Sequence, residues 1–140
     1  MYAVVRVRGS VDVPEKIQDT LKMLRLDRVN RCVLVPDSPD FKGMLKKAGN
    51  FITWGEISPK TLETLIYKRG FIKNKKIEQK ESKSIAGKIM KEKTVRVAKI
   101  RPVFRLSPPS KGYRSIKKRF PKGDLGYRGE KINDLLKRMI

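Results

Sequence analysis

The sequence predicts a small α/β domain (α+β in arrangement) with a strongly basic extension, and three observations lead to this fold class. Strand-like and helix-like patterns alternate over residues 1–57. A serine followed by a proline, which is typical of a helix start, recurs at residues 38–39 and 58–59. The net charge is +3 over residues 1–58 (10 basic, 7 acidic) and +12 over residues 91–140 (16 basic, 4 acidic). The front of the chain therefore resembles an ordinary globular domain, and the back resembles a binding surface.

The first of three expected segments, residues 1–57, is predicted to form a core with the order β-α-β-α-β. In the first strand valines alternate with arginines, so it is expected to be half-buried with Arg6 and Arg8 on the solvent face. The second helix is expected to begin at Ser38 and to end at Gly49-Asn50 in a left-handed conformation. The three expected strands cover residues 2–8, 32–35 and 51–57, and the two helices follow Pro14 and Ser38. Their order in the sheet is left open by the spacing alone.

The second segment, residues 58–106, is expected to be a helical insertion followed by an edge segment. A helix that begins at Ser58 should end at Gly70. The lysine-rich stretch 71–80 is expected to be an irregular surface loop, and a helix is expected over residues 81–93. Residues 95–106 alternate roughly, and their proline predicts an edge strand or an extended segment.

The third segment, residues 107–140, is predicted to be a basic loop closed by a helix. Residues 107–129 hold seven Lys or Arg, three aromatic residues, four Gly and three Pro. Because this stretch lacks apolar periodicity and is highly charged, it is expected to add no element to the core and to avoid burial. Residues 130–140 place five apolar side chains at helical spacing, which predicts an amphipathic helix that packs on the core. The loop should then be anchored at both ends.

The composition limits the classes of function. The chain has 35 basic and 14 acidic residues and a net charge of +21, which favours a polyanionic partner. It contains no histidine, so the commonest general base and metal ligand is missing. Its one cysteine, Cys32, lies in an apolar run and is expected to be a core residue. We therefore expect no enzyme, metal site or cofactor, and we expect a cytosolic protein because no signal peptide or apolar span is evident.

The basic stretch 107–129 is the strongest functional signal. Its Lys and Arg side chains can neutralise phosphates and release counterions, so the stretch is expected to bind RNA. Three aromatic residues within it, Tyr113, Phe120 and Tyr127, can stack on unpaired bases. A disordered basic tail is the alternative interpretation, but the amphipathic helix that follows argues against a free tail. Trp54, on an alternating strand, is expected to pack in the core rather than to stack on a base.

The order of several motifs resembles the large-subunit ribosomal protein thirty family, in its longer archaeal and eukaryotic form. The front part matches at Val5-Arg6-Val7-Arg8-Gly9, Leu24-Arg25-Leu26, Asp37-Ser38-Pro39 and Gly55-Glu56-Ile57. The back part matches the archaeal form at Lys68-Arg69-Gly70, residues 101–106, Pro108-Pro109 and residues 126–133. The resemblance covers essentially the whole chain.

This resemblance implies a ferredoxin-like domain that is built into the large ribosomal subunit and binds ribosomal RNA in the neighbourhood of the 5S RNA. It implies neighbouring large-subunit proteins as further partners, and no enzymatic activity, cofactor, small-molecule substrate or membrane. Together with the basic loop, it implies RNA contacts at Arg6, Arg8, Lys47, Arg105, Lys111, Tyr113, Arg114, Lys117, Lys118, Arg119, Phe120, Lys122, Tyr127 and Arg128.

Three other functions compete with a ribosomal role. A free-standing RNA-binding or RNA-chaperone protein would have the same composition. An enzyme acting on RNA is disfavoured because histidine is absent and no acid pair has a credible site. A peripheral membrane protein is disfavoured because the basic residues lie in a Gly- and Pro-rich loop and not along the polar face of an amphipathic helix.

Overall fold

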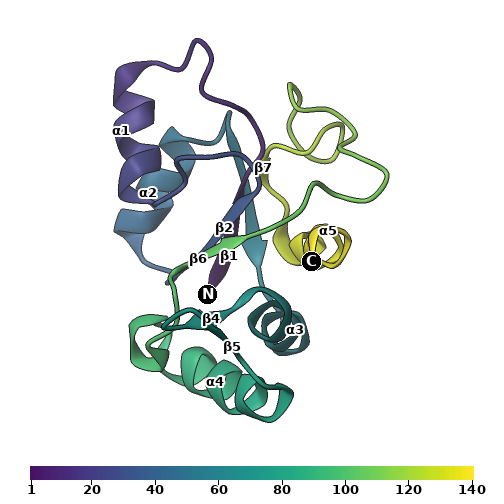
Figure 1. The fold of residues 1–140 in the computed structure, drawn as a ribbon. Coiled ribbons are helices and arrows are strands. Elements are labelled where there is room, and N and C mark those ends of the chain that lie inside the picture. The colour runs from purple at the N-terminus through teal and green to yellow at the C-terminus, as the bar shows by residue number, and fades with distance from the viewer.

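The protein folds around one five-stranded sheet with helices on both faces (Figure 1). The computed structural model describes residues 1–140, with the side chain of Val97 excepted. The strand order is β6-β2-β1-β3-β7, so the first strand of the chain is the central strand of the sheet. Helices α1 and α2 cover one face, and α3 and α5 cover the other, with α4 packed beyond α3 (Figure 1).

The order β-α-β-α-β predicted for the front of the chain is confirmed. It consists of β1 (Tyr2–Arg6), α1 (Glu15–Met23), β2 (Arg31–Val35), α2 (Pro39–Lys47) and β3 (Ile52–Glu56). Ser38 caps α2 as expected, because its Oγ accepts a hydrogen bond from the backbone N–H of Phe41 at 3.4 Å. The prediction that this helix ends in a left-handed conformation is wrong. Neither Gly49 nor Asn50 has a positive φ, and α2 ends in a turn in which the N–H of Phe51 donates to the carbonyl of Ala48.

Strand β1 is buried on both faces, so the expectation of a half-buried strand is wrong. Ala3 and Val5 point into the core beneath α3 and α5, whereas Tyr2 and Val4 point into the core beneath α1 and α2. Successive side chains of β1 do point to opposite faces of the sheet, as predicted. Both faces are covered because α3 and α5, which follow the β-α-β-α-β segment, supply the second layer of helices. Arg6, expected on the solvent face, is 2% exposed.

The middle segment contains α3 (Pro59–Arg69), α4 (Gln79–Glu92), the 3-10 turn η1 (Arg96–Ala98) and β6 (Val103–Arg105). Both helices and the edge position of β6 agree with the prediction. The irregular loop expected over residues 71–80 is wrong, because β4 (Phe71–Ile72) and β5 (Lys75–Lys76) form a hairpin. Its two turn residues, Lys73 and Asn74, both have positive φ, as a tight two-residue hairpin turn requires.

The last segment adds a strand as well as the predicted helix. Strand β7 (Gly126–Tyr127) pairs in parallel with β3, and the turn η2 (Gly129–Lys131) leads into α5 (Ile132–Met139). The expectation that residues 107–129 add nothing to the core is therefore wrong, and Leu125 is 1% exposed. Gly55 on β3 makes this docking possible, because a Cβ there would lie 2.0 Å from the carbonyl oxygen of Gly129.

Candidate nucleic-acid interface

The basic loop folds around one buried carboxylate, that of Asp124, which is 3% exposed. Its Oδ1 accepts a hydrogen bond from Nη2 of Arg128 at 2.9 Å. Its Oδ2 accepts from the backbone N–H groups of Arg114 and Ser115. A buried charge is tolerated when it is paired and hydrogen-bonded. Here the hydrogen bonds connect the residues before the tip of the loop (114 and 115) and the residue after it (128) to the same carboxylate. The loop therefore has a defined shape in the protein alone.

The tip of the loop is a tight turn that presents lysines to solvent. Oγ of Ser115 accepts from the backbone N–H groups of Lys117 and Lys118, and the N–H of Phe120 donates to the carbonyl of Leu125 at 2.8 Å. Gly123 fits against the turn because a Cβ would lie 2.1 Å from the carbonyl oxygen of Lys118. Nη2 of Arg119 donates to Oδ1 of Asn50 at 3.1 Å and ties the turn to the end of α2, whereas the side chains of Lys117, Lys118 and Lys122 make no hydrogen bond within the described residues.

The structure divides the predicted contact residues by exposure. Three are half-buried: Arg8, Tyr113 and Phe120. Two, Arg6 and Arg128, are buried. Nine are exposed: Lys47, Arg105, Lys111, Arg114, Lys117, Lys118, Arg119, Lys122 and Tyr127. The loop brings together most of the exposed set, whereas Lys47 lies at the end of α2 and Arg105 lies on the opposite edge strand.

Arg6 is an internal brace. Its Nη1 donates to the carbonyl of Leu26 at 2.6 Å, Nε donates to the carbonyl of Arg8 at 2.9 Å, and Nη2 donates to Oγ of Ser10 at 3.1 Å. Burial lowers the pKa of this guanidinium from its ordinary value. The side chain thus ties the end of β1 to the segment after α1, and strand alternation alone could not show this inward path.

Arg128 forms the floor of a basin of about 620 Å³ within the loop. Its guanidinium pairs with Asp124 at 2.9 Å and lies over the ring of Phe120, 5.0 Å from the ring centroid. Among the described residues, its Nε and Nη1 have no hydrogen-bond partner. Four more cations line the basin: Lys111, Arg114, Lys131 and Arg138. Positive charge therefore prevails there, although Asp124 and Asp134 also line it.

The two tyrosines of the loop have different surroundings. The hydroxyl of Tyr113 donates to Oδ1 of Asn30 at 3.0 Å, and burial raises its pKa to about 12. Tyr113 therefore links the loop to the core. Tyr127 is 50% exposed, and its hydroxyl donates to Oε1 of Glu56 at 3.2 Å, which leaves a fixed ring at the surface. Trp54, whose ring lies 6.3 Å from that of Tyr127, is buried as expected for a core residue.

A second basic surface lies at the β6 edge, where sequence reasoning had named only Arg105. It is a groove of about 680 Å³ between β6, the end of α3 and the β4–β5 hairpin, which we call the edge groove. Its six basic side chains are those of Arg31, Lys68, Arg69, Lys76, Arg101 and Arg105, and no acidic residue is among its described lining residues. The pairs Lys68-Arg69 and Lys75-Lys76 were visible signals, but their approach to β6 was not.

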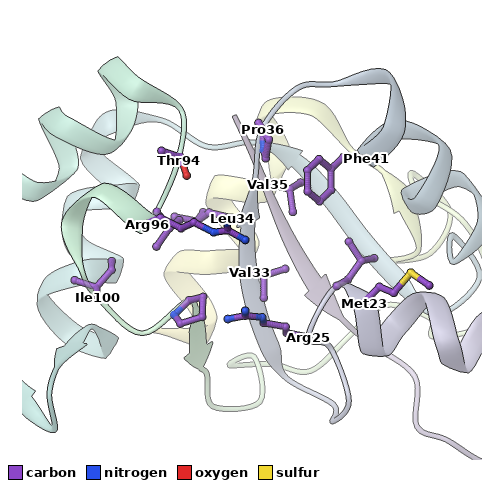
Figure 2. A pocket seen from close by; sticks show the side chains of 13 residues that line it. Met23, Arg25, Val33, Leu34, Val35, Pro36, Phe41, Thr94, Arg96 and Ile100 are labelled. Atoms are coloured by element: carbon purple, nitrogen blue, oxygen red, sulfur yellow. The ribbon is translucent and has the colours of Figure 1, made fainter.

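A third hollow is chiefly apolar and offers no acid–base chemistry. It measures about 590 Å³ and lies beside β2, with Met23 and Phe41 on one side and Arg96 and Ile100 on the other (Figure 2). No acidic residue lines it in the described structure. Cys32 is fully buried as expected, and burial raises the pKa of its thiol to about 12. Within the described residues there is no cluster of three possible metal ligands, and no helix is long and apolar enough to cross a membrane.

Comparison with known proteins decides the family. Residues 2–52 match the family model described as "Ribosomal protein L30p/L7e". The chain is 48% identical to the large ribosomal subunit protein uL30 of Methanococcus maripaludis, over 99% of each chain. It is 42% identical to the uL30 of Methanosphaera stadtmanae over the whole of each chain, and 48% identical to that of Nanoarchaeum equitans over 100% of this chain and 99% of the relative. The chain belongs to the uL30 family.

The uL30 relationship extends beyond the region that the family model matches. That region ends at residue 52, within β3, and so includes neither the edge groove's Lys68 nor the basic loop. The match to the archaeal uL30 relatives covers 99–100% of this chain, so it spans the segments that form both basic surfaces. The mixed sheet with helices is the ferredoxin-like uL30 fold, in which the C-terminal half adds the outer strands β6 and β7.

Proposed function

We propose that the protein is a structural constituent of the large ribosomal subunit that binds ribosomal RNA, in the neighbourhood of the 5S RNA. The observation that supports this most strongly is the similarity along the full chain to proteins named large ribosomal subunit protein uL30. The net charge of +21 suits a polyanionic partner. The protein then belongs to the cytoplasmic ribosome, next to other large-subunit proteins, and it has no enzymatic role.

The exposed residues of the loop are the proposed RNA contacts. Lys117, Lys118 and Lys122 project from the tight turn at the tip, where they can neutralise closely packed phosphates. Tyr127 presents a fixed ring that can stack on an unpaired base. Arg6 and Arg128 belong to the predicted set as well, and their burial supports a positioning role for both side chains.

The fold of the loop also supports a clamp-like mechanism. The bonds to Asp124 hold the turn in one shape before RNA arrives, so less conformational entropy is lost on binding than with a free basic tail. A rigid basic turn can then pin an RNA segment in one arrangement. Affinity should come chiefly from counterion release, so it should fall as salt concentration rises.

The test is incorporation of a triple variant, Lys117→Gln with Lys118→Gln and Lys122→Gln, into large subunits. The three substitutions remove exposed charges and leave the turn's backbone hydrogen bonds intact. We expect the variant to be lost from large subunits during sedimentation through high salt, while the unchanged protein co-sediments. The matched control removes three exposed charges from α4, Lys83, Lys88 and Lys91, and should co-sediment normally.

Two results would contradict the proposal. If the unchanged protein appears only in the free fraction, the ribosomal role is wrong and a free-standing RNA-binding protein is the better interpretation. If the loop variant co-sediments as well as the α4 control, the loop is not the clamp. The curated relatives named above do not favour the free-standing alternative, since all are ribosomal proteins.

A further inference from the structure

We propose that the edge groove is a second RNA-binding site, which holds the phosphates of a different RNA segment from the one that the loop contacts. The protein would then join two RNA segments across its sheet. The inference rests on the proposed function, because it assigns the groove's partner as ribosomal RNA. It goes further in naming a site that lies outside residues 107–129.

The groove collects its cations from four separate parts of the chain. Arg31 begins β2, Lys68 lies near the end of α3, Lys76 lies on β5, Arg101 precedes β6, and Arg105 is the last residue of β6. Its volume of about 680 Å³ can accommodate a nucleotide's sugar and phosphate, since sites for small ligands measure about 300–1,000 Å³. The surface is therefore concave and basic, and its shape depends on tertiary contacts.

Little within the protein balances this charge. Arg31 pairs with Asp27, whereas Nη2 of Arg69 donates to Oγ of Ser107 at 2.7 Å and to the main-chain oxygen of Ile140 at 3.2 Å. Arg101 is held by neutral groups, since it donates to Oδ1 of Asn74 and lies over the ring of Phe71. Across the described residues, five of the six cations form no ion pair: Lys68, Arg69, Lys76, Arg101 and Arg105.

The register of the sheet places two of these cations directly opposite each other. Arg31 on β2 is the cross-strand partner of Arg105 on β6. Like charges in directly opposite positions destabilise a sheet. A phosphate bound between them would replace this repulsion with two attractions, and a planar guanidinium suits phosphate oxygens through paired hydrogen bonds.

An RNA backbone suits this groove better than an added protein strand. The edge that β6 presents is only three residues long, and Pro102 beside it has no N–H to offer to a further strand. Strand addition relies on main-chain hydrogen bonds, which are scarce here. Basic side chains, in contrast, line the groove throughout.

The groove and the far end of the loop lie at opposite edges of the sheet, although the loop begins beside the groove, where Nη2 of Arg69 donates to Oγ of Ser107 at 2.7 Å. β6 is one edge strand, and β7, which ends the loop, is the other. Five strands spaced about 4.8 Å apart separate these edges by roughly 19 Å. Figure 1 shows the hairpin β4–β5 and the loop on different sides of the molecule. One short RNA segment cannot contact both the groove and the lysines at the loop's tip without passing around the domain, so two segments are expected.

The experiment compares three double variants by hydroxyl-radical footprinting of ribosomal RNA in assembled large subunits. The groove variant is Lys76→Gln with Arg105→Gln, the loop variant is Lys117→Gln with Lys118→Gln, and the control is Lys88→Gln with Lys91→Gln. Each removes two exposed charges. We expect the groove and loop variants each to lose protection at a different RNA segment, and the control to lose none.

A second readout uses a ribosomal RNA fragment that contains the segment protected by the groove. The groove variant should reduce the magnitude of the slope of log K against log salt by about 1.4, from two single-strand phosphate contacts. Unchanged protections and an unchanged slope would overturn the groove site while leaving the proposed function intact. Loss of the same segment in both variants would overturn the two-segment arrangement. A cross-link from the groove to protein alone would also overturn the assignment to RNA.

Discussion

At the scale of single residues, the ion pair of Asp124 and Arg128 determines whether residues 107–129 form a folded loop or a disordered tail. The carboxylate receives three hydrogen bonds from residues 114, 115 and 128, and it is 3% exposed. Removing one partner of a buried ion pair leaves an uncompensated charge. Asp124 is the only acidic residue in the basic stretch 107–129, and its role in organising the loop could be recognised only from its contacts in the structure.

Asp124→Asn tests this role. The amide removes the negative charge that balances Arg128, so the free energy of unfolding should fall by about 3–5 kcal/mol, as for other broken buried pairs. Urea unfolding followed by circular dichroism measures the change. The control Asp19→Asn, at an exposed position in the middle of α1, should alter stability by less than about 0.5 kcal/mol. Equal stability of the two variants would show that the buried pair does not organise the loop.

At the scale of elements, close backbone approaches decide how the C-terminal segment joins the sheet. Strand β3 accepts β7 at its edge, and the turn before α5 passes over Gly55. The N–H of Arg128 donates to the carbonyl of Trp54 at 2.9 Å, which extends the β3–β7 contact. The amphipathic pattern of α5 was readable in the sequence, but the strand before it has two residues and no periodic signal.

Gly55→Ala tests the close contact between β3 and the backbone of Gly129. A methyl group there would lie 2.0 Å from the carbonyl oxygen of Gly129, so the backbone must shift, at a cost of about 1–3 kcal/mol for overpacking. Thermal unfolding should show a lower Tm. The matched control is Gly87→Ala on the exposed face of α4, where nothing lies within 4 Å of the new methyl group. That change should stabilise the protein by about 0.4–1 kcal/mol, and a gain at both positions would contradict the packing described.

At the scale of the whole molecule, unpaired positive charge gathers on two surfaces, the edge groove beside β6 and the tip of the loop. The helices on both faces bury the strands, so the sheet's edges and the loop remain for a partner. Seven exposed cations have no ion pair among the described residues and face these two surfaces: Lys68, Lys76, Arg101, Arg105, Lys117, Lys118 and Lys122.

Binding to a large-subunit RNA fragment should therefore depend steeply on salt. If each of the seven cations neutralises one phosphate, log K should fall against log salt with a slope of about −5. Filter binding between low and moderate salt measures this slope. A slope shallower than about −2 would mean that most of these cations contact no phosphate.

Much of the fold and the nature of the partner could be read from local patterns. Ser38 and Ser58 marked helix starts, the apolar run around Cys32 marked a buried strand, and the charge gradient along the chain indicated RNA. These features depend on neighbouring residues or on composition, so no knowledge of distant contacts is needed. The motif order was also sufficient to indicate the uL30 family.

Local patterns could not predict whether an individual basic side chain is buried or exposed. Nothing in the local sequence distinguishes Arg6 and Arg128 from the exposed arginines, yet both side chains are buried. Arg6 donates to the carbonyl of Leu26 in a separate segment, and Arg128 donates to Asp124, whose carboxylate is buried by the folding of the whole loop. The edge groove likewise exists only because β2, α3, β5 and β6 meet. Local sequence sets which residues are helical, extended or charged. Contacts between residues far apart in the chain decide which charges are internal supports and which form a surface for RNA.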